Sequence, residues 1–230
     1  MTTISSRHNP LVKRIREAIR IHEGEIVIEG VKAVQDAIAH GWKPIELLHR
    51  GVELSNEIFD SLAETKTPQS VIALFERPAP APLFAHEESI AVALDGVQDP
   101  GNVGTIIRLA AAFDAGAVAL LPNCADPYSP KSIRASVGTV LNVSLARASV
   151  EDLLHSGWPL FAADGSGEAI EPPARRAILV FGNEGSGVSP AIAEHGKRIA
   201  IRTSGKVESL NVAASAAILL SQSYQLRCRS

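Results

Sequence analysis

The chain has 230 residues, of which 46% are hydrophobic and 20% charged, with 17 glycines and 14 prolines. This composition is that of an ordinary globular protein and excludes a disordered, collagen-like or coiled-coil chain. The formal net charge of −3 conceals a basic segment, because residues 1–20 carry five basic side chains and one acidic one. Such a segment on an acidic body is typical either of a phosphate-contacting patch or of a solvated amphipathic helix.

The sequence also excludes several classes of site and cellular location. Cys124 and Cys228 are too few for a disulfide scaffold or a cysteine-rich metal site, and the seven histidines form no His-x-x-x-His pair. The longest uncharged stretch, 210–226, is interrupted by polar residues and cannot span a membrane. The first twenty residues lack the apolar core of a secretion signal. We therefore expect a cytoplasmic protein with no metal and no membrane contact.

In chain order, the first part alternates helical and extended patterns. We expect helices over 10–20, 31–40 and 56–63, and strands over 25–28, 45–49 and 70–75. This alternation favours a small α/β unit over a helix bundle. Three prolines at alternate positions then mark the segment 76–88 as an extended connector. The sequence thus predicts an N-terminal domain over 1–75, a proline-rich linker over 76–88 and a second domain over 89–230.

The second part alternates more clearly. We expect strands over 90–94, 117–121, 143–146, 160–163, 178–181 and 198–201, with helices over 103–114, 131–137, 150–155, 189–194 and 211–226. Short apolar strands separated by helices predict a parallel sheet covered on both faces. The last helix is apolar nearly all round from residue 213 to 220, which predicts that it packs on its own sheet and on a second subunit.

Three polar, glycine-containing segments follow predicted strands, where ligands bind in open α/β sheets. In the first, 95–104, Asn102 can cap a helix that carries Arg108 one turn further on. A binding site and a merely structural capped helix, with Arg108 paired to a local carboxylate, explain this segment equally well. In the second, 181–190, three glycines surround Glu184, which has no evident structural purpose and so favours a ligand loop. In the third, 198–212, Ser209 or Asn211 caps the last helix.

The segment 126–138 carries Lys131 and Arg134, a pattern that in isolation is typical of a solvated helix. Better-known sequence signatures of catalytic and binding sites are missing. The chain has no dinucleotide fingerprint, no phosphate loop and no nucleophile elbow. From the residues alone, the prediction is an α/β ligand-binding domain with a basic N-terminal appendage.

Taken in order, these segments resemble the SpoU (TrmH-like) branch of the SPOUT RNA methyltransferases. Residues 99–108 (DPGNVGTIIR), 181–189 (FGNEGSGVS) and 201–212, which ends in ESLNV, are similar to the family's three motifs, and 128–138 (YSPKSIRASVG) to its intervening segment. The opening 5–13 (SSRHNPLVK) and Glu29-Gly30 resemble the L30e-like RNA-binding domain that many members carry. After Ile201 the family commonly has proline, whereas this chain has Arg202.

The resemblance implies transfer of a methyl group from S-adenosylmethionine to a ribose 2′-oxygen of structured RNA, without a metal. It implies a homodimer and a SPOUT-type parallel-sheet domain with a C-terminal trefoil knot, one of the rare knotted folds. Ribosomal RNA is the favoured substrate. The alternatives are a tRNA 2′-O-ribose methyltransferase and a non-catalytic RNA-binding module of the same fold, with a small-molecule-binding protein as a third possibility.

The resemblance also assigns residues by position. The catalytic and RNA-facing cluster comprises Asn102, Arg108, Glu184, Ser209 and Asn211, with Arg108 nearest the reacting hydroxyl. The cofactor-binding residues are Gly182, Asn183, Gly185, Ile201 and Leu210. The basic residues expected to contact RNA are Arg7, Lys13, Arg14, Arg16, Lys131 and Arg134.

Overall fold

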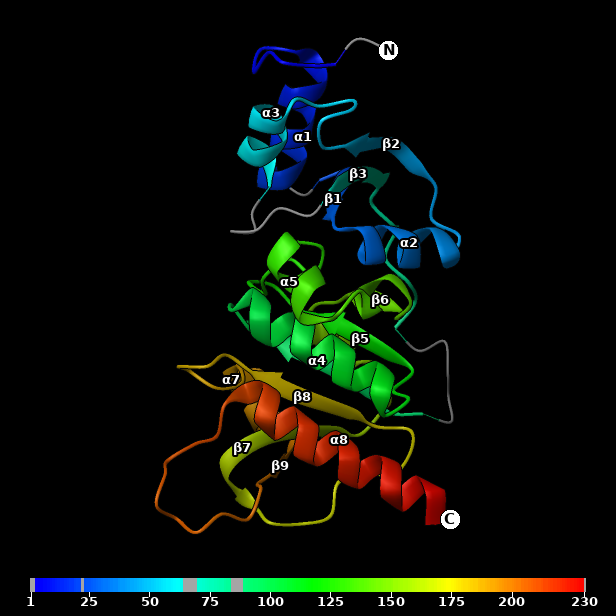
Figure 1. Ribbon diagram of the computed structural model, residues 1–230. Helices are drawn as coiled ribbons and strands as arrows, with labels where there is room; N and C mark the ends of the chain where they lie inside the picture. The colour runs from blue at the N-terminus through cyan, green and yellow to red at the C-terminus, as the bar shows by residue number, and fades with distance from the viewer. Residues whose placement is uncertain (1–2, 22, 64–69, 84–88, 230) are drawn as a thin grey trace.

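The computed structural model describes residues 3–21, 23–63, 70–83 and 89–229, which form two β-sheets with helices packed against them (Figure 1). The first part contains α1 (Pro10–Ile21), β1 (Glu25–Glu29), α2 (Val31–Ala39), β2 (Pro44–His49), α3 (Asn56–Leu62) and β3 (Val71–Glu76). Its three strands pair antiparallel in the order β1-β3-β2. The predicted α/β character of this part is confirmed.

The second part carries a six-stranded, all-parallel sheet in the order β6-β5-β4-β8-β7-β9. Its elements are β4 (Ala91–Asp95), α4 (Pro100–Ala112), β5 (Ala117–Leu120), α5 (Pro130–Ala135), the short 3₁₀ helix η1 (Thr139–Leu141), β6 (Leu145–Arg147), α6 (Val150–Leu154), β7 (Leu160–Glu168), β8 (Ile178–Gly182), α7 (Pro190–His195), β9 (Lys197–Ile199) and α8 (Val212–Arg229). The prediction of a parallel sheet is confirmed. The trefoil knot stays a prediction.

Successive side chains of a strand point to opposite faces of the sheet, and this alternation decides which residues meet in each core. In β4 and β8, Val92, Leu94, Leu179 and Phe181 face the largest buried cluster, on the side of α4 and α8. The alternate residues of the same two strands face a second cluster that includes Leu153 of α6 and Ile192 of α7. The sheet is therefore covered by helices on both faces, as its continuous apolar strands predict.

Strands β7 and β9 differ from their predicted bounds. β7 continues to Glu168 instead of ending at 163, and β9 ends at Ile199 instead of 201. Gly167 makes the longer β7 possible, because a Cβ there would lie 2.8 Å from the backbone carbon of Arg198. The last bond between these segments joins the Ala200 N–H to the Glu168 carbonyl (2.9 Å), and the chain then leaves the sheet.

The two sheets share one hydrophobic core rather than standing apart. Residues of β1, α2 and β3 belong to the same buried cluster as residues of α4, α5 and β5. Trp42 lies at the junction, where its ring contacts Phe75 edge-on (centroids 6.0 Å apart) and Tyr128 (6.2 Å), and its Nε1 donates to the Leu141 carbonyl (3.3 Å). This packing opposes free movement of the first part relative to the second.

The predicted linker is partly built into the structure. Glu76 is the last residue of β3, and Arg77 forms a double hydrogen bond with the Asp126 carboxylate (2.7 and 3.2 Å). The Ala81 N–H donates to the Leu145 carbonyl (2.7 Å), which fixes the segment beside β6 (Figure 1). Residues 84–88 lie outside the described residues, and the boundaries 1–75, 76–88 and 89–230 stay predictions.

Helix α8 lies along the face of the parallel sheet and packs on α4 and β8 (Figure 1). It buries Ala213, Ala216, Leu219, Leu220 and Ser223. Tyr224 is 38% exposed, and its ring also contacts Phe113 at the end of α4 (centroids 6.2 Å apart). The helix is therefore buried on one side in a single copy of the chain. Within the described ranges, no helix combines the length and the apolar character that a membrane span requires.

Candidate active site

The loops that follow β4 and β8 are joined at the carboxyl edge of the parallel sheet. The Asn183 Nδ2 donates to the Gly96 carbonyl (2.8 Å), and the Asp95 carboxylate accepts from the Ser189 N–H (2.6 Å). The end of β4 thus holds the glycine-rich loop 182–189 near both of its ends. Sequence reasoning missed Asp95, although an acidic residue directly after an apolar strand was a usable signal.

The glycine-rich loop has a defined shape. Asn183 and Gly187 exchange two backbone hydrogen bonds of 2.9 Å, and the Asn183 Oδ1 accepts from the N–H groups of Gly185 (2.9 Å) and Ser186 (3.0 Å). Gly182 is buried, and a Cβ there would lie 2.2 Å from the backbone carbon of Gly187. Only glycine fits this crossing, which explains one of the three glycines by close backbone approach.

Three residues far apart in the sequence meet in one hydrogen-bonded cluster. The Asn102 Nδ2 donates to the Glu184 carboxylate (2.8 Å), and the Asn211 Nδ2 donates to the Asn102 Oδ1 (3.2 Å). Glu184 also accepts from the backbone N–H groups of Gln98 and Asp99, each at 3.3 Å. The structure therefore brings together three of the five predicted catalytic residues: Asn102, Glu184 and Asn211.

The cluster keeps Glu184 ionised. Partial burial opposes the charge, but the hydrogen bond from Asn102 and the backbone donors, Gln98 and Asp99 among them, outweigh it and lower the pKa of Glu184 below its ordinary value. A carboxylate that accepts several donors is fixed in position and is not a ready proton acceptor. Glu184 thus has the structural purpose that its sequence context did not reveal: it ties loop 182–189 to the start of α4.

The capping predictions are half right. Asn211 caps α8, since its Oδ1 accepts from the N–H groups of Ala213 (2.9 Å) and Ala214 (3.2 Å). Asn102 does not cap α4. Asp99 does, by accepting from the Gly101 N–H (2.9 Å), and Pro100 occupies the first helical position. Asn102 lies inside the first turn, which leaves its amide available to Glu184 and Asn211.

The other two predicted catalytic residues lie outside this cluster. Arg108 is exposed on α4, about 9 Å further along the helix axis than Asn102. Among the described residues its guanidinium has neither a hydrogen bond nor an ion pair, so the alternative of a locally paired arginine is wrong. Ser209 is exposed in the loop before α8, where no described residue forms a hydrogen bond with its hydroxyl.

Two predicted cofactor residues come from the loop that joins β9 to α8. Ile201 and Leu210 are half-buried, and the carbonyl of Glu208 lies 3.4 Å from where a Cβ of Gly165 in β7 would stand. Because β7, β8 and β9 run parallel, the segments that follow them meet at the same edge of the sheet as the glycine-rich loop. Arg202, which replaces the usual proline, is exposed.

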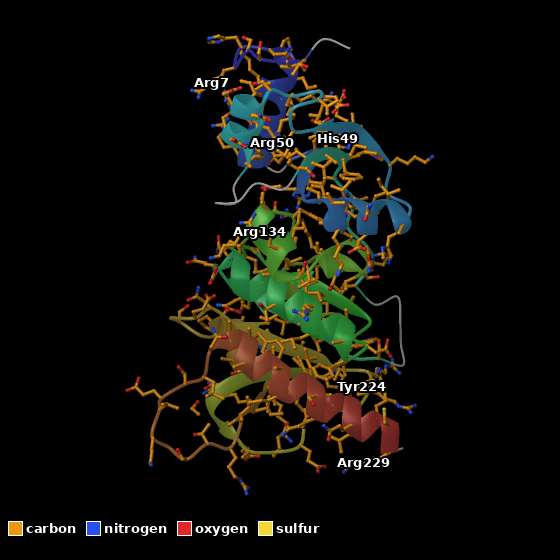
Figure 2. All side chains as sticks on the ribbon, viewed as in Figure 1. Arg7, His49, Arg50, Arg134, Tyr224 and Arg229 are labelled. Carbon is orange, nitrogen blue, oxygen red and sulfur yellow. The ribbon has the colours of Figure 1, made fainter. Side chains whose placement is uncertain are left out.

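The predicted RNA-contacting residues differ in their surroundings. Lys131 pairs with Asp99 (2.5 Å), and this hydrogen bond together with that from Gly101 lowers the pKa of the Asp99 carboxyl. Arg14 pairs with Glu25, and Arg16 donates to the Ser61 hydroxyl (3.1 Å). Lys13 is exposed, as are Arg7 and Arg134, which lie on the same side of the molecule in Figure 2. No group of three metal-ligating side chains exists in the described ranges.

Comparison with known proteins gives concordant matches. The model of the SpoU rRNA Methylase family matches residues 89–221. The 23S rRNA (guanosine(2553)-2′-O)-methyltransferase RlmP of Bacillus subtilis (strain 168) is 34% identical over 187 residues, which cover 76% of this chain and 71% of the relative. An AdoMet-bound rRNA methyltransferase from Sinorhizobium meliloti superposes with a TM-score of 0.85 over 98% of both chains, at 29% identity. The SpoU methyltransferase AviRb from Streptomyces viridochromogenes, in complex with AdoMet, superposes with a TM-score of 0.84 over 96% of this chain and 99% of its own, at 25% identity.

Proposed function

The chain belongs to the SpoU rRNA methylase family, and from that premise we propose that it methylates a ribose 2′-oxygen of structured RNA with S-adenosylmethionine as the methyl donor. The observation that carries the proposal is the cluster of Asn102, Glu184 and Asn211, in which three separate segments meet at the carboxyl edge of the sheet. The full-length superposition on AdoMet-bound rRNA methyltransferases supports it. Ribosomal RNA is the proposed substrate, because RlmP, one of the most similar relatives, is a 23S rRNA methyltransferase.

The residues at the sheet edge fit S-adenosylmethionine. The glycine-rich loop is exposed at Gly185, whose N–H is held by the Asn183 side chain, and Ile201 and Leu210 add partly exposed apolar surface. Gly182 keeps the loop close to the strand, and the side chain of Asn183 holds its shape. S-adenosylmethionine supplies a methyl group that its sulfonium charge already activates, so the protein has mainly to position the reacting atoms. Positioning of this kind can supply about 7–11 kcal/mol of a barrier.

Arg108 acts on the 2′-hydroxyl in this proposal. A guanidinium has a pKa above about 12 and is a poor base, so general-base catalysis by Arg108 does not fit its chemistry. Its fixed positive charge can stabilise the alkoxide that develops as the hydroxyl proton passes to solvent water, which reaches the exposed Arg108, and it can hold the neighbouring phosphate. The exposed guanidinium, without an ion pair in the described part of the chain, is available for this role.

The hydrogen-bonded cluster has a positioning role. Asn102, Glu184 and Asn211 tie the start of α4, the glycine-rich loop and the start of α8 together, so the methyl donor and Arg108 keep one relative position. Ser209, exposed beside this cluster, contacts the RNA or the cofactor in this proposal.

The first part of the chain is proposed to be an L30e-like RNA-binding domain. Its exposed Arg7 and Lys13 lie on the same part of the chain as Arg14 and Arg16, and Lys131 and Arg134 extend the basic surface beside the active site. We further propose a homodimer through the methyltransferase domain, because α8 leaves Ala214, Gln222 and Gln225 exposed on a helix whose other side is buried. Sedimentation at micromolar concentration tests this; a monomer would contradict it.

The direct test is methyl transfer from labelled S-adenosylmethionine to total ribosomal RNA and, separately, to bulk tRNA. Mass spectrometry then identifies the modified nucleoside. A 2′-O-methyl signal in ribosomal RNA alone is expected, and a signal in tRNA alone would contradict the proposed substrate. Arg108→Ala is expected to lower turnover at least a hundredfold while S-adenosylmethionine still binds. Binding of RNA without any transfer would favour a non-catalytic module.

A further inference from the structure

A cavity outside the candidate active site opens at the carboxyl ends of β5 and β6. Its volume is about 560 Å³, within the range of roughly 300–1,000 Å³ that small-molecule sites occupy. Leu120 and Leu145 give it apolar walls from the sheet, and Pro78 and Pro80 close it from the segment that follows β3. Cys124 and Tyr128 line it as well. It is therefore a slot of mixed character, with apolar walls and with polar side chains that include Asp126, Arg147 and Asp152.

Tyr128 brings a hydroxyl to this slot. The residue is only 7% exposed and no described residue forms a hydrogen bond with its hydroxyl, but the oxygen itself is not fully buried, so it stays accessible from the cavity. Burial raises the pKa of Tyr128 to about 12, so the hydroxyl stays a donor at neutral pH. The ring itself is held by Trp42 on one side and by the Arg77 guanidinium, 4.8 Å from its centroid.

The cavity and the candidate active site share a wall. The Cys124 thiol donates to the Leu94 carbonyl (3.1 Å), and the Ala125 N–H donates to the Val97 carbonyl (2.8 Å). The segment 94–97 leads directly into the loop whose backbone binds Glu184. A group in the cavity therefore lies one chain segment away from the place where we propose that methyl transfer occurs.

A nucleobase fits this combination of features. A flat ring can enter between proline and leucine side chains, and its polar edge can accept from the Tyr128 hydroxyl. Arg147 lines the cavity, is exposed and forms no ion pair with any described residue, so it can meet the adjoining phosphate. Enzymes that act on structured RNA commonly read unstacked bases in this way.

We propose that this cavity, called the base pocket below, binds an unpaired base of the RNA close to the methylated nucleotide. This assignment rests on the proposed function, since it takes the substrate to be RNA. The base pocket then selects the RNA sequence or local structure, whereas the cluster around Glu184 positions the reaction. The same ring chemistry could come from a free nucleoside, so the test separates the two sources.

The first test removes only the unpaired hydroxyl. Tyr128→Phe is expected to raise the KM for ribosomal RNA about three- to tenfold, the effect of one hydrogen bond, with the affinity for S-adenosylmethionine unchanged. The unaltered protein is the reference for this comparison. An equal KM for Tyr128→Phe and for the unaltered protein would overturn the proposal, while methyl transfer by the unaltered protein would leave the proposed function standing.

The second test reports on occupancy directly. In a Cys228→Ser variant Cys124 is the only cysteine, and its alkylation by N-ethylmaleimide can be timed with and without added ligands. Ribosomal RNA is expected to slow this alkylation at least threefold, including when S-adenosylmethionine is saturating. Protection by millimolar adenosine, guanosine, cytidine or uridine but not by RNA would assign the pocket to a free nucleoside and overturn its RNA role. Protection by S-adenosylmethionine alone would assign it to the cofactor and equally overturn the proposal.

Discussion

The crossing at Gly182 gives the sharpest test of how the glycine-rich loop is built. In Gly182→Ala the new Cβ would lie 2.2 Å from the Gly187 carbon and 2.3 Å from the Val188 nitrogen, so the loop backbone must move by about 0.8 Å to reach even the closest tolerable contact. That shift disrupts the two 2.9 Å bonds between Asn183 and Gly187. At about 1 kcal/mol each, their loss costs about 2 kcal/mol, which agrees with the usual cost of overpacking.

Thermal unfolding and cofactor binding measure this effect separately. For a chain of this size, 2 kcal/mol corresponds to a fall in Tm of about 4–8 °C. Titration calorimetry should also show weaker binding of S-adenosylmethionine. Gly185→Ala is the control for stability, because its Cβ would meet only the Asn183 Oδ1, at an ordinary 3.5 Å. If Gly182→Ala unfolds at the same temperature as Gly185→Ala, the close approach does not constrain the loop and the reasoning is refuted.

Three further substitutions probe the polar cluster and a strained turn. Because the folded state lowers the pKa of Glu184, its carboxylate stabilises the fold above the ordinary glutamate pKa of about 4.3 and loses that effect as the pH falls through the lowered value. Glu184→Gln should therefore lower the urea midpoint at pH 7, and its difference from the unaltered protein should shrink as the pH falls below the lowered pKa. Val137 is 53% exposed with a φ of 53°, a costly conformation for a β-branched residue, so Val137→Gly should add about 1 kcal/mol of stability in urea denaturation; a loss of stability would contradict this. Asn211→Asp keeps the oxygen that caps α8 but removes the donor to Asn102. We therefore expect a near-normal Tm with at least tenfold slower methyl transfer. A matching fall in Tm and in the transfer rate would refute separate capping and positioning roles for Asn211.

Much of the fold could be predicted because its signals are local. Short apolar strands and the capping Asn211 each act within a few residues. Apart from the sheet order and the bounds of β7 and β9, the elements lie close to where the patterns place them. The capping error at α4 was avoidable, since Pro100 at the first helical position points to Asp99. In contrast, the role of Glu184 depends on Asn102, 82 residues away, and no periodicity carries that information.

The N-terminal part shows the same limit at a larger scale. Its composition and proline-rich exit predict a separate unit, yet Trp42 and Phe75 pack into a core that continues to α4 and α5. Whether an apolar face is covered by the domain's own helix or by a second domain depends on tertiary packing, not on hydrophobic periodicity. The packing of the first part against α4 and α5 also affects RNA recognition. If the first part binds RNA as proposed, it does so at a fixed distance from the active site.

The cluster around Glu184 explains how the loop 182–189 can be both glycine-rich and fixed in place. Glycine permits the close crossing at 182 but leaves the backbone free to move, so the loop needs fixed partners outside itself. Asp95 and Gly96 hold it from β4, and the Glu184 carboxylate holds it to the backbone that begins α4. Asp99, whose N–H binds Glu184, also caps α4 with its carboxylate, and Asn211 caps α8 with its oxygen while its Nδ2 donates to Asn102, so the residues that begin these helices also hold the site. A site made this way gains its precision from secondary structure that must form in any case, rather than from contacts that only a bound ligand would complete.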